Sequence, residues 1–104
     1  SPDVVRDFLY VKDVVKGCLL VLEKGESMKP YNVGYGTTVN IGDIVNTILK
    51  VTGKTPDVQW DNSKPTTIPF RSCSTERIET ELGFKPDYTF EQGMKETIEW
   101  YENL

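Results

Sequence analysis

The stretch VRDFLYVKD at residues 5–13, followed by VVKGCLLVLEK at residues 14–24, decides the fold that this sequence predicts. Residues 7–11 are strand-like, and Asp13 is placed to cap a helix that runs from Val14 to about Lys24 and closes at Gly25. Apolar residues recur along this helix at spacings of three and four, and they are Val14, Val15, Cys18, Leu19 and Leu22. A strand that leads directly into an amphipathic helix predicts an α/β protein.

The middle of the chain continues this alternation. Residues 31–33 predict a short strand, and Asn40 is placed to cap a second helix that ends at Gly53. The apolar positions of that helix are Ile41, Ile44, Val45, Ile48 and Leu49. Residues 57–60 predict another short strand, whereas the prolines and polar residues of 61–69 predict a loop.

Two capping signals predict helices near the carboxyl end. Ser74 is placed to cap a helix that stops at Gly83, and Thr89 and Gln92 have the spacing of a capping box for the last helix. Because Met and aromatic residues at helical spacing usually pack inside a protein, we expect one stripe of the last helix to lie in the core. The stripe consists of Phe90, Met94, Ile98 and Tyr101.

Composition narrows the classes of protein to consider. The 104 residues fit a single α/β domain, residues 1–104, and the net charge of −4 argues against nucleic-acid and membrane partners, which both require clustered positive charge. Cys18 and Cys73 form no C-x-x-C pair and there is no histidine, so the sequence predicts no metal site and reduced thiols in the cytoplasm. No apolar run approaches the length of a membrane span.

Several segments resemble the extended short-chain dehydrogenase/reductases, the family of NAD-dependent epimerases and dehydratases. Residues 5–13 resemble the family segment R-D-[FY]-[ILT]-[YH]-V-x-D, and NVGYG at residues 32–36 resembles its N-[VL]-G-x-G turn. NIGDI at residues 40–44 resembles its capped helix start, and ELGFKP at residues 81–86 resembles its E-L-G-[FW]-x-P. The resemblance implies the small mixed α/β substrate-binding domain that lies C-terminal to the Rossmann domain in this family.

Within the family, the loop at residues 60–71 most resembles that of the GDP-L-fucose synthases. The resemblance implies that Arg6 contacts the substrate pyrophosphate and that a basic loop residue, Lys64 or Arg71, contacts it from the other side. Arginine suits this role because its planar guanidinium matches the oxygen acceptors of a diphosphate. Thr66 is a further candidate, for contact with the nucleotide.

Plainer interpretations of the same residues stay open at this point. Arg6 next to Asp7 also has the pattern of a surface ion pair, and Lys64 that of a solvated loop charge. Asp61 has the pattern of an aspartate that caps its own turn. We expect Asp7 and Asp13 to be structural.

The resemblance implies the substrate-binding portion of an NAD(P)-dependent nucleotide-sugar epimerase, dehydratase or reductase. The chain has no glycine-rich phosphate loop after a strand and no Tyr-x-x-x-Lys pair. We therefore expect a C-terminal part of a longer enzyme that is inactive alone, with NAD or NADP bound by an N-terminal Rossmann domain outside this chain.

The partners implied are the nucleotide-diphosphate-sugar substrate and that Rossmann domain. We expect the apolar helix from Val14 to Leu22 to expose a patch or to cover it by self-association as a homo-oligomer. The alternative from another class is a freestanding non-enzymatic module that binds a nucleotide or a protein.

Overall fold

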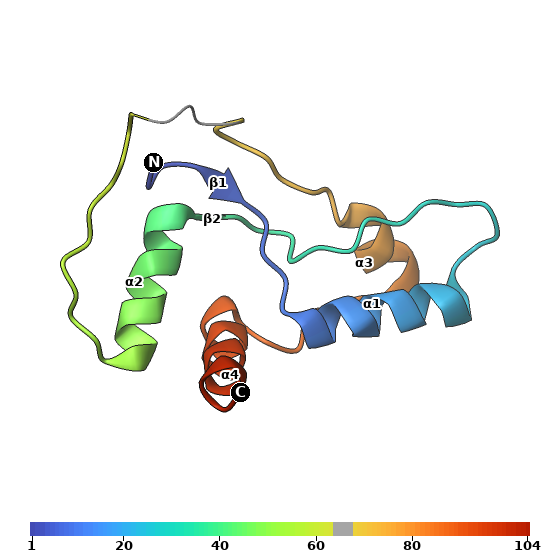
Figure 1. The fold of residues 1–104 in the computed structure, drawn as a ribbon. Coiled ribbons are helices and arrows are strands. Elements are labelled where there is room, and N and C mark those ends of the chain that lie inside the picture. Colours follow the sequence, from blue (N-terminus) through green and yellow to red (C-terminus); the bar gives the residue numbers. More distant parts are fainter. Residues whose placement is uncertain (64–67) are drawn as a thin grey trace.

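The computed structural model describes residues 1–63 and 68–104. Two short strands and four helices follow one another along the chain (Figure 1). They are β1 (Val5–Arg6), α1 (Val11–Lys24), β2 (Val39–Asn40), α2 (Ile41–Thr52), α3 (Glu76–Leu82) and α4 (Phe90–Glu102). Among the described residues, no helix has the length and apolar character that crossing a bilayer requires.

Strand β1 lies between two other segments of the chain. It pairs with β2 in antiparallel fashion, with Val5 opposite Asn40 and Arg6 opposite Val39. On its other side, Val5 forms an isolated parallel bridge with Phe70. The β1 backbone therefore joins the entrance of α2 to the segment that follows the loop.

The helices form two pairs around these strands. α1 packs against α3, and α2 packs against α4 (Figure 1). Two glycines allow close approach: a Cβ at Gly17 would lie 2.5 Å from Cγ1 of Val33, and a Cβ at Gly93 would lie 2.8 Å from Cβ of Tyr10. The expected mixed α/β class is confirmed.

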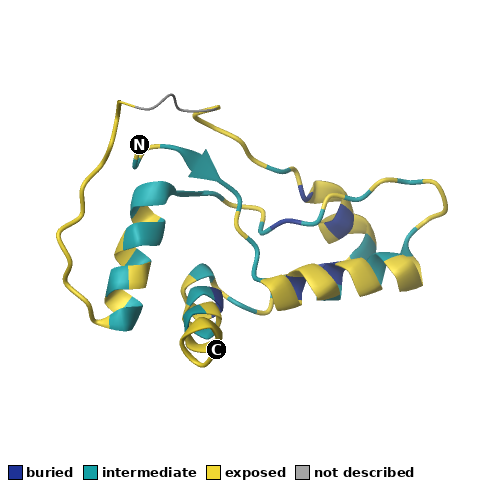
Figure 2. Ribbon diagram, viewed as in Figure 1, coloured by how far each residue is buried: buried dark blue, intermediate teal, exposed yellow. Residues whose placement is uncertain are grey.

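The hydrophobic core is small. Among the described residues, the buried hydrophobic side chains are Ile78 and Phe84, both at the α3 end of the molecule (Figure 2). The radius of gyration is 16.1 Å, whereas a compact domain of this length has a radius of about 13 Å. Hydrophobic burial alone therefore holds little of the chain together.

Several helix ends lie where the sequence predicts them. The Asn40 side chain accepts a hydrogen bond from the Asp43 N–H at 2.7 Å, and Thr89 and Gln92 form a complete capping box. Gly53 and Gly83 adopt left-handed conformations with φ of 69° and 71° at the ends of α2 and α3. These predictions are confirmed because each depends on groups within four residues of one another.

The predicted start of the first helix is wrong. α1 begins at Val11, and the strand lies earlier, at Val5–Arg6, so the expected strand at residues 7–11 is not formed. Asp13 lies in the first turn, where its buried carboxylate accepts the N–H groups of Asp87 at 2.9 Å and Tyr88 at 3.1 Å. The carboxylate therefore caps the connection before α4 and not the start of its own helix.

The other two strand predictions and the Ser74 cap are also wrong. Residues 31–33 and 57–60 form no strand, because neither segment has a neighbouring strand in the described part of the chain. Thr75 rather than Ser74 precedes α3, and its hydroxyl donates to Glu79 at 2.9 Å instead of accepting a backbone N–H.

The apolar stripes of α1 and α4 are less buried than a core would require. On α1, Val15, Leu19 and Leu22 are 52%, 59% and 82% exposed (Figure 2). On α4, Phe90, Met94 and Ile98 are partly buried. The expectation of core packing is wrong for Tyr101, which lies in the last turn of α4 and is 72% exposed.

We predict that Asp13→Asn lowers the free energy of unfolding by about 1.5 to 3 kcal/mol, because a neutral amide loses charge-assisted bonds and turns an N–H₂ toward a backbone donor. Asp87→Asn is the matched control, since the Asp87 carboxylate is 66% exposed and meets Lys16 at 2.8 Å on the surface. We expect that variant to lose about 0 to 1 kcal/mol. Urea denaturation checks both, and equal losses would contradict the role of Asp13.

Candidate diphosphate-binding site

The segment after the loop is fixed to β1 by backbone hydrogen bonds. The Val5 N–H donates to the Pro69 carbonyl at 2.9 Å, and the Arg71 N–H donates to the Val5 carbonyl at 3.1 Å. These bonds place Phe70 beside Val5 in parallel register. Continuing that register by one residue places Arg71 opposite Arg6, where partners in a parallel pair project to the same side.

The Arg6 side chain turns toward the same segment. Its Nη1 donates to the Val5 carbonyl and its Nη2 to the Ile68 carbonyl, both at 2.7 Å. A guanidinium can make such contacts together because its donors form a rigid planar fork. The sequence gives no signal for Ile68, since its contribution comes from a backbone carbonyl.

The predicted site residues fall into two groups. The structure brings Arg6 and Arg71 together at β1, and Arg71 is exposed, with no side-chain hydrogen bond or ion pair to another described residue. Two arginines at paired positions of adjacent segments place positive charge at this edge, and a positive potential favours an anion. Lys64 and Thr66 lie outside the described residues, so their predicted contacts stay predictions.

Asp61, at the entrance of the loop, caps its own turn as the plainer interpretation predicts. Its Oδ1 accepts the Ser63 hydroxyl at 2.5 Å and the Ser63 N–H at 3.0 Å. The hydroxyl, and then the backbone N–H, lower the pKa of this carboxyl by stabilising the charged form. The loop therefore begins with a turn that its own side chains define.

Asp7 fixes the other side of β1. Its Oδ1 accepts the Tyr35 N–H at 2.8 Å and its Oδ2 accepts the Gly36 N–H at 3.0 Å. Gly36 has a φ of 94°, which residues with a side chain rarely adopt. Asp7 and Asp13 each accept two backbone N–H groups, which agrees with the expectation that both hold the structure together.

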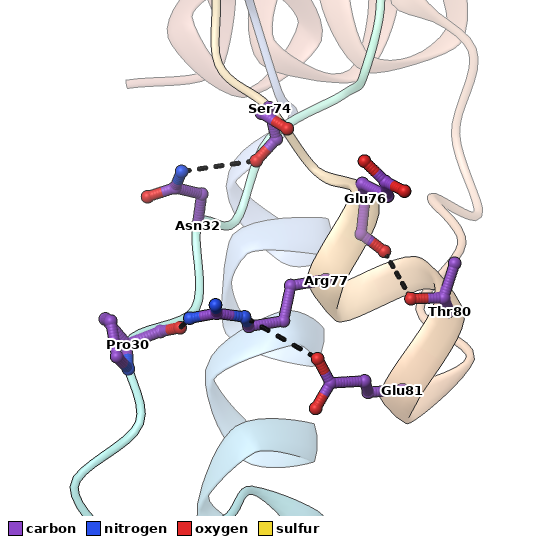
Figure 3. Close-up of a pocket in the computed structure, with 7 residues that line it drawn as sticks. All are labelled: Pro30, Asn32, Ser74, Glu76, Arg77, Thr80 and Glu81. Atoms are coloured by element: carbon purple, nitrogen blue, oxygen red, sulfur yellow. Dashed lines mark hydrogen bonds and ion pairs between the residues drawn. The ribbon is translucent and has the colours of Figure 1, made fainter.

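A polar pocket lies elsewhere, between residues 30–32 and α3 (Figure 3). Arg77 donates to the Pro30 carbonyl at 2.9 Å and lies 3.5 Å from Glu81, and Asn32 donates to the Ser74 carbonyl at 3.2 Å. Neither Arg6 nor Arg71 is among the described residues that line this pocket. Its carboxylates make it a poorer place for a diphosphate than the β1 edge.

Comparison with known proteins identifies the family. The family model described as GDP-mannose 4,6 dehydratase matches residues 2–97. The chain is 31% identical over 101 residues to the probable GDP-L-fucose synthase 1 of Oryza sativa subsp. japonica, covering 96% of this chain and 30% of that protein. The chain thus spans about a third of the length of the curated relatives that it matches.

Solved structures agree with this result. dTDP-glucose 4,6-dehydratase from Bacillus anthracis str. Ames in complex with NAD has a TM-score of 0.88 at 32% identity, covering 99% of this chain and 33% of that chain. UDP-glucose 4-epimerase from Thermotoga maritima with UDP-glucose has a TM-score of 0.89 at 25% identity, with coverage of 99% and 33%.

The fold is therefore that of the extended short-chain dehydrogenase/reductases, a class of enzymes that includes sugar-nucleotide epimerases and dehydratases. Within it, the chain belongs to the GDP-mannose 4,6 dehydratase family.

We predict that iodoacetamide at pH 8 modifies Cys18 on the order of tenfold faster than Cys73, because the thiolate is the reacting form. Cys18 is exposed, whereas burial raises the pKa of the Cys73 thiol and the negative charge of Asp7 raises it further. Mass spectrometry of the alkylated peptides gives both rates. Urea should remove the difference, and equal rates in the native protein would contradict the half-buried placement of Cys73 beside Asp7.

Proposed function

We propose that residues 1–104 are the substrate-binding portion of an NAD(P)-dependent nucleotide-sugar epimerase, dehydratase or reductase that resembles GDP-L-fucose synthase. The observation that carries the proposal is the pair Arg6 and Arg71, held side by side by the β1 backbone. The relative from Thermotoga maritima, which contains UDP-glucose in its crystal structure, supports a nucleotide-sugar as the substrate class.

In this proposal, Arg6 and Arg71 bind the substrate diphosphate. Among the described residues, the Arg6 guanidinium donates to the neutral carbonyl oxygens of Val5 and Ile68. Charged phosphate oxygens form hydrogen bonds roughly twice as strong as neutral acceptors do, so a diphosphate competes well for the same donors. Lys64 and Thr66 are proposed from the sequence to contact the diphosphate and the nucleotide.

The role of this chain is to bind and orient the substrate, while a second part of the enzyme holds NAD or NADP. The nicotinamide, when bound, exchanges hydride with the sugar. Two observations support this division: the relative from Bacillus anthracis binds NAD and is about three times as long as this chain, and the sequence lacks a glycine-rich phosphate loop. In this proposal the chain alone is inactive, and the enzyme that contains it is located in the cytoplasm.

We propose further that the exposed face of α1, formed by Val15, Leu19 and Leu22, packs against that second part. A helix face with such large exposed apolar side chains is costly in water and marks an interface. The small core and the open shape support the same conclusion, because the chain buries too little apolar surface by itself.

Arg6→Ala in the enzyme that contains these residues should cost about 2 to 4 kcal/mol of transition-state binding, the scale of a lost charge-assisted contact. Arg6→Lys should recover only part of this loss, because an ammonium cannot form the bidentate fork. Arg77→Ala is the matched control, since Arg77 also donates to a backbone carbonyl but lies at the polar pocket. Values of kcat/KM with UDP-, GDP- and dTDP-sugars check this, and equal values for Arg6→Ala and the unaltered enzyme would end the proposal.

In the enzyme that contains this chain, Leu19→Glu should lower the free energy of unfolding by about 2 kcal/mol or more if the part that holds NAD or NADP covers the α1 face. In the 104-residue chain alone, the same change should stay within about 0.5 kcal/mol, because Leu19 is exposed there. Met28→Glu, at a residue that is 99% exposed, is the control in both.

Denaturation of the two proteins measures the difference, and sedimentation reports the mass of the chain alone. If the chain alone forms a dimer that Leu19→Glu dissociates, then the face binds a second copy and the proposed contact with the second part is wrong.

A further inference from the structure

Arg6 is the last residue of β1, and Asp7 follows it directly. Their side chains form hydrogen bonds with different segments on opposite sides of the strand. The Asp7 carboxylate accepts the N–H groups of Tyr35 and Gly36, whereas the Arg6 guanidinium donates to the Ile68 carbonyl. Successive side chains of an extended chain project to opposite faces. Arg6 and Asp7 therefore connect the turn at residues 34–36 to the segment that carries Arg71.

The turn that Asp7 holds has little freedom to move. A Cβ at the buried Gly34 would lie 3.2 Å from Asp7 Oδ2 and 3.2 Å from Cys73 Sγ, which shows how closely these groups approach. Gly36 is fixed in a left-handed conformation. A charged acceptor with two backbone donors on a rigid turn fixes the backbone that carries it.

We infer that Asp7 is a positioning residue for the substrate diphosphate, acting through Arg6. This inference rests on the proposed role of Arg6 and adds a second residue to it. Because Asp7 is held by these hydrogen bonds, the backbone at the end of β1 cannot rotate. The Arg6 guanidinium therefore stays on the side of β1 where Arg71 lies. Displacement of a binding group by about 1 Å is enough to reduce its contribution strongly.

Asp13 provides a matched control within the same chain. Its carboxylate also accepts two backbone N–H groups, at 2.9 and 3.1 Å, but these belong to Asp87 and Tyr88 at the α3 to α4 connection. A purely structural role for Asp7 would make Asp7→Asn and Asp13→Asn alike in every measurement. A positioning role separates them in diphosphate binding.

The test uses the enzyme that contains these residues, with variants Arg6→Ala, Asp7→Asn, Asp13→Asn and the Arg6→Ala/Asp7→Asn double variant. Calorimetry with UDP, GDP and dTDP identifies the nucleotide that binds and measures its Kd, and the corresponding nucleoside without phosphate serves as the second probe. We expect Asp7→Asn to weaken diphosphate binding on the order of tenfold and nucleoside binding less than about twofold. We expect Asp13→Asn to lower the melting temperature while changing diphosphate binding less than about twofold.

The double variant tests whether Asp7 acts through Arg6. In the Arg6→Ala background, Asp7→Asn should weaken diphosphate binding by less than about twofold, because the group that it positions is gone. Asp7→Glu, which keeps the charge but lengthens the side chain by one methylene, serves in place of Asp7→Asn if that variant does not fold. It should also weaken diphosphate binding.

Two results would overturn the inference, and they differ from each other. If Arg6→Ala leaves diphosphate binding unchanged, the proposed site fails and the role of Asp7 fails with it. If Arg6→Ala weakens binding but Asp7→Asn behaves like Asp13→Asn, or its effect adds in full to that of Arg6→Ala, then the site stands and Asp7 is structural only.

Discussion

The backbone of Val5 is the constraint on which the rest of the structure depends. It pairs with β2 on one side and bonds to Pro69 and Arg71 on the other. Segments more than thirty and sixty residues away thereby meet at one short strand. Because all of these partners are backbone groups, the arrangement tolerates many side chains at Val5 while fixing where its neighbours lie.

Two aspartate carboxylates join segments of this chain that a larger hydrophobic core would hold together in another protein. Asp7 fixes the 34–36 turn to the end of β1, and Asp13 fixes α1 to the start of α4. Each carboxylate accepts two backbone N–H groups, and hydrogen bonds to a charged group are stronger than those between neutral groups. These hydrogen bonds and the exposed apolar face of α1 agree with the proposal that the chain packs against another part of an enzyme.

Arg6 combines a structural and a proposed functional role. Its contacts with the Val5 and Ile68 carbonyls hold the segment after the loop, and the same fork is suited to phosphate oxygens. The plainer interpretation was an ion pair between Arg6 and Asp7. In the structure, the Asp7 carboxylate instead accepts the N–H groups of Tyr35 and Gly36. A binding group that is already held in place loses less conformational entropy when a ligand arrives.

The sequence by itself determined the family, the α/β class and several of the helix ends. The Asn40 cap, the box of Thr89 and Gln92 and the turn at Gly83 depend on hydrogen bonds within a few residues, which propensity captures. Only the tertiary structure decided that Asp13 binds donors 74 and 75 residues away and that Arg71 lies beside Arg6. The strands predicted at residues 31–33 and 57–60 are not formed for the same reason. A strand exists only with a partner strand, and the identity of that partner depends on the folded chain and not on the segment.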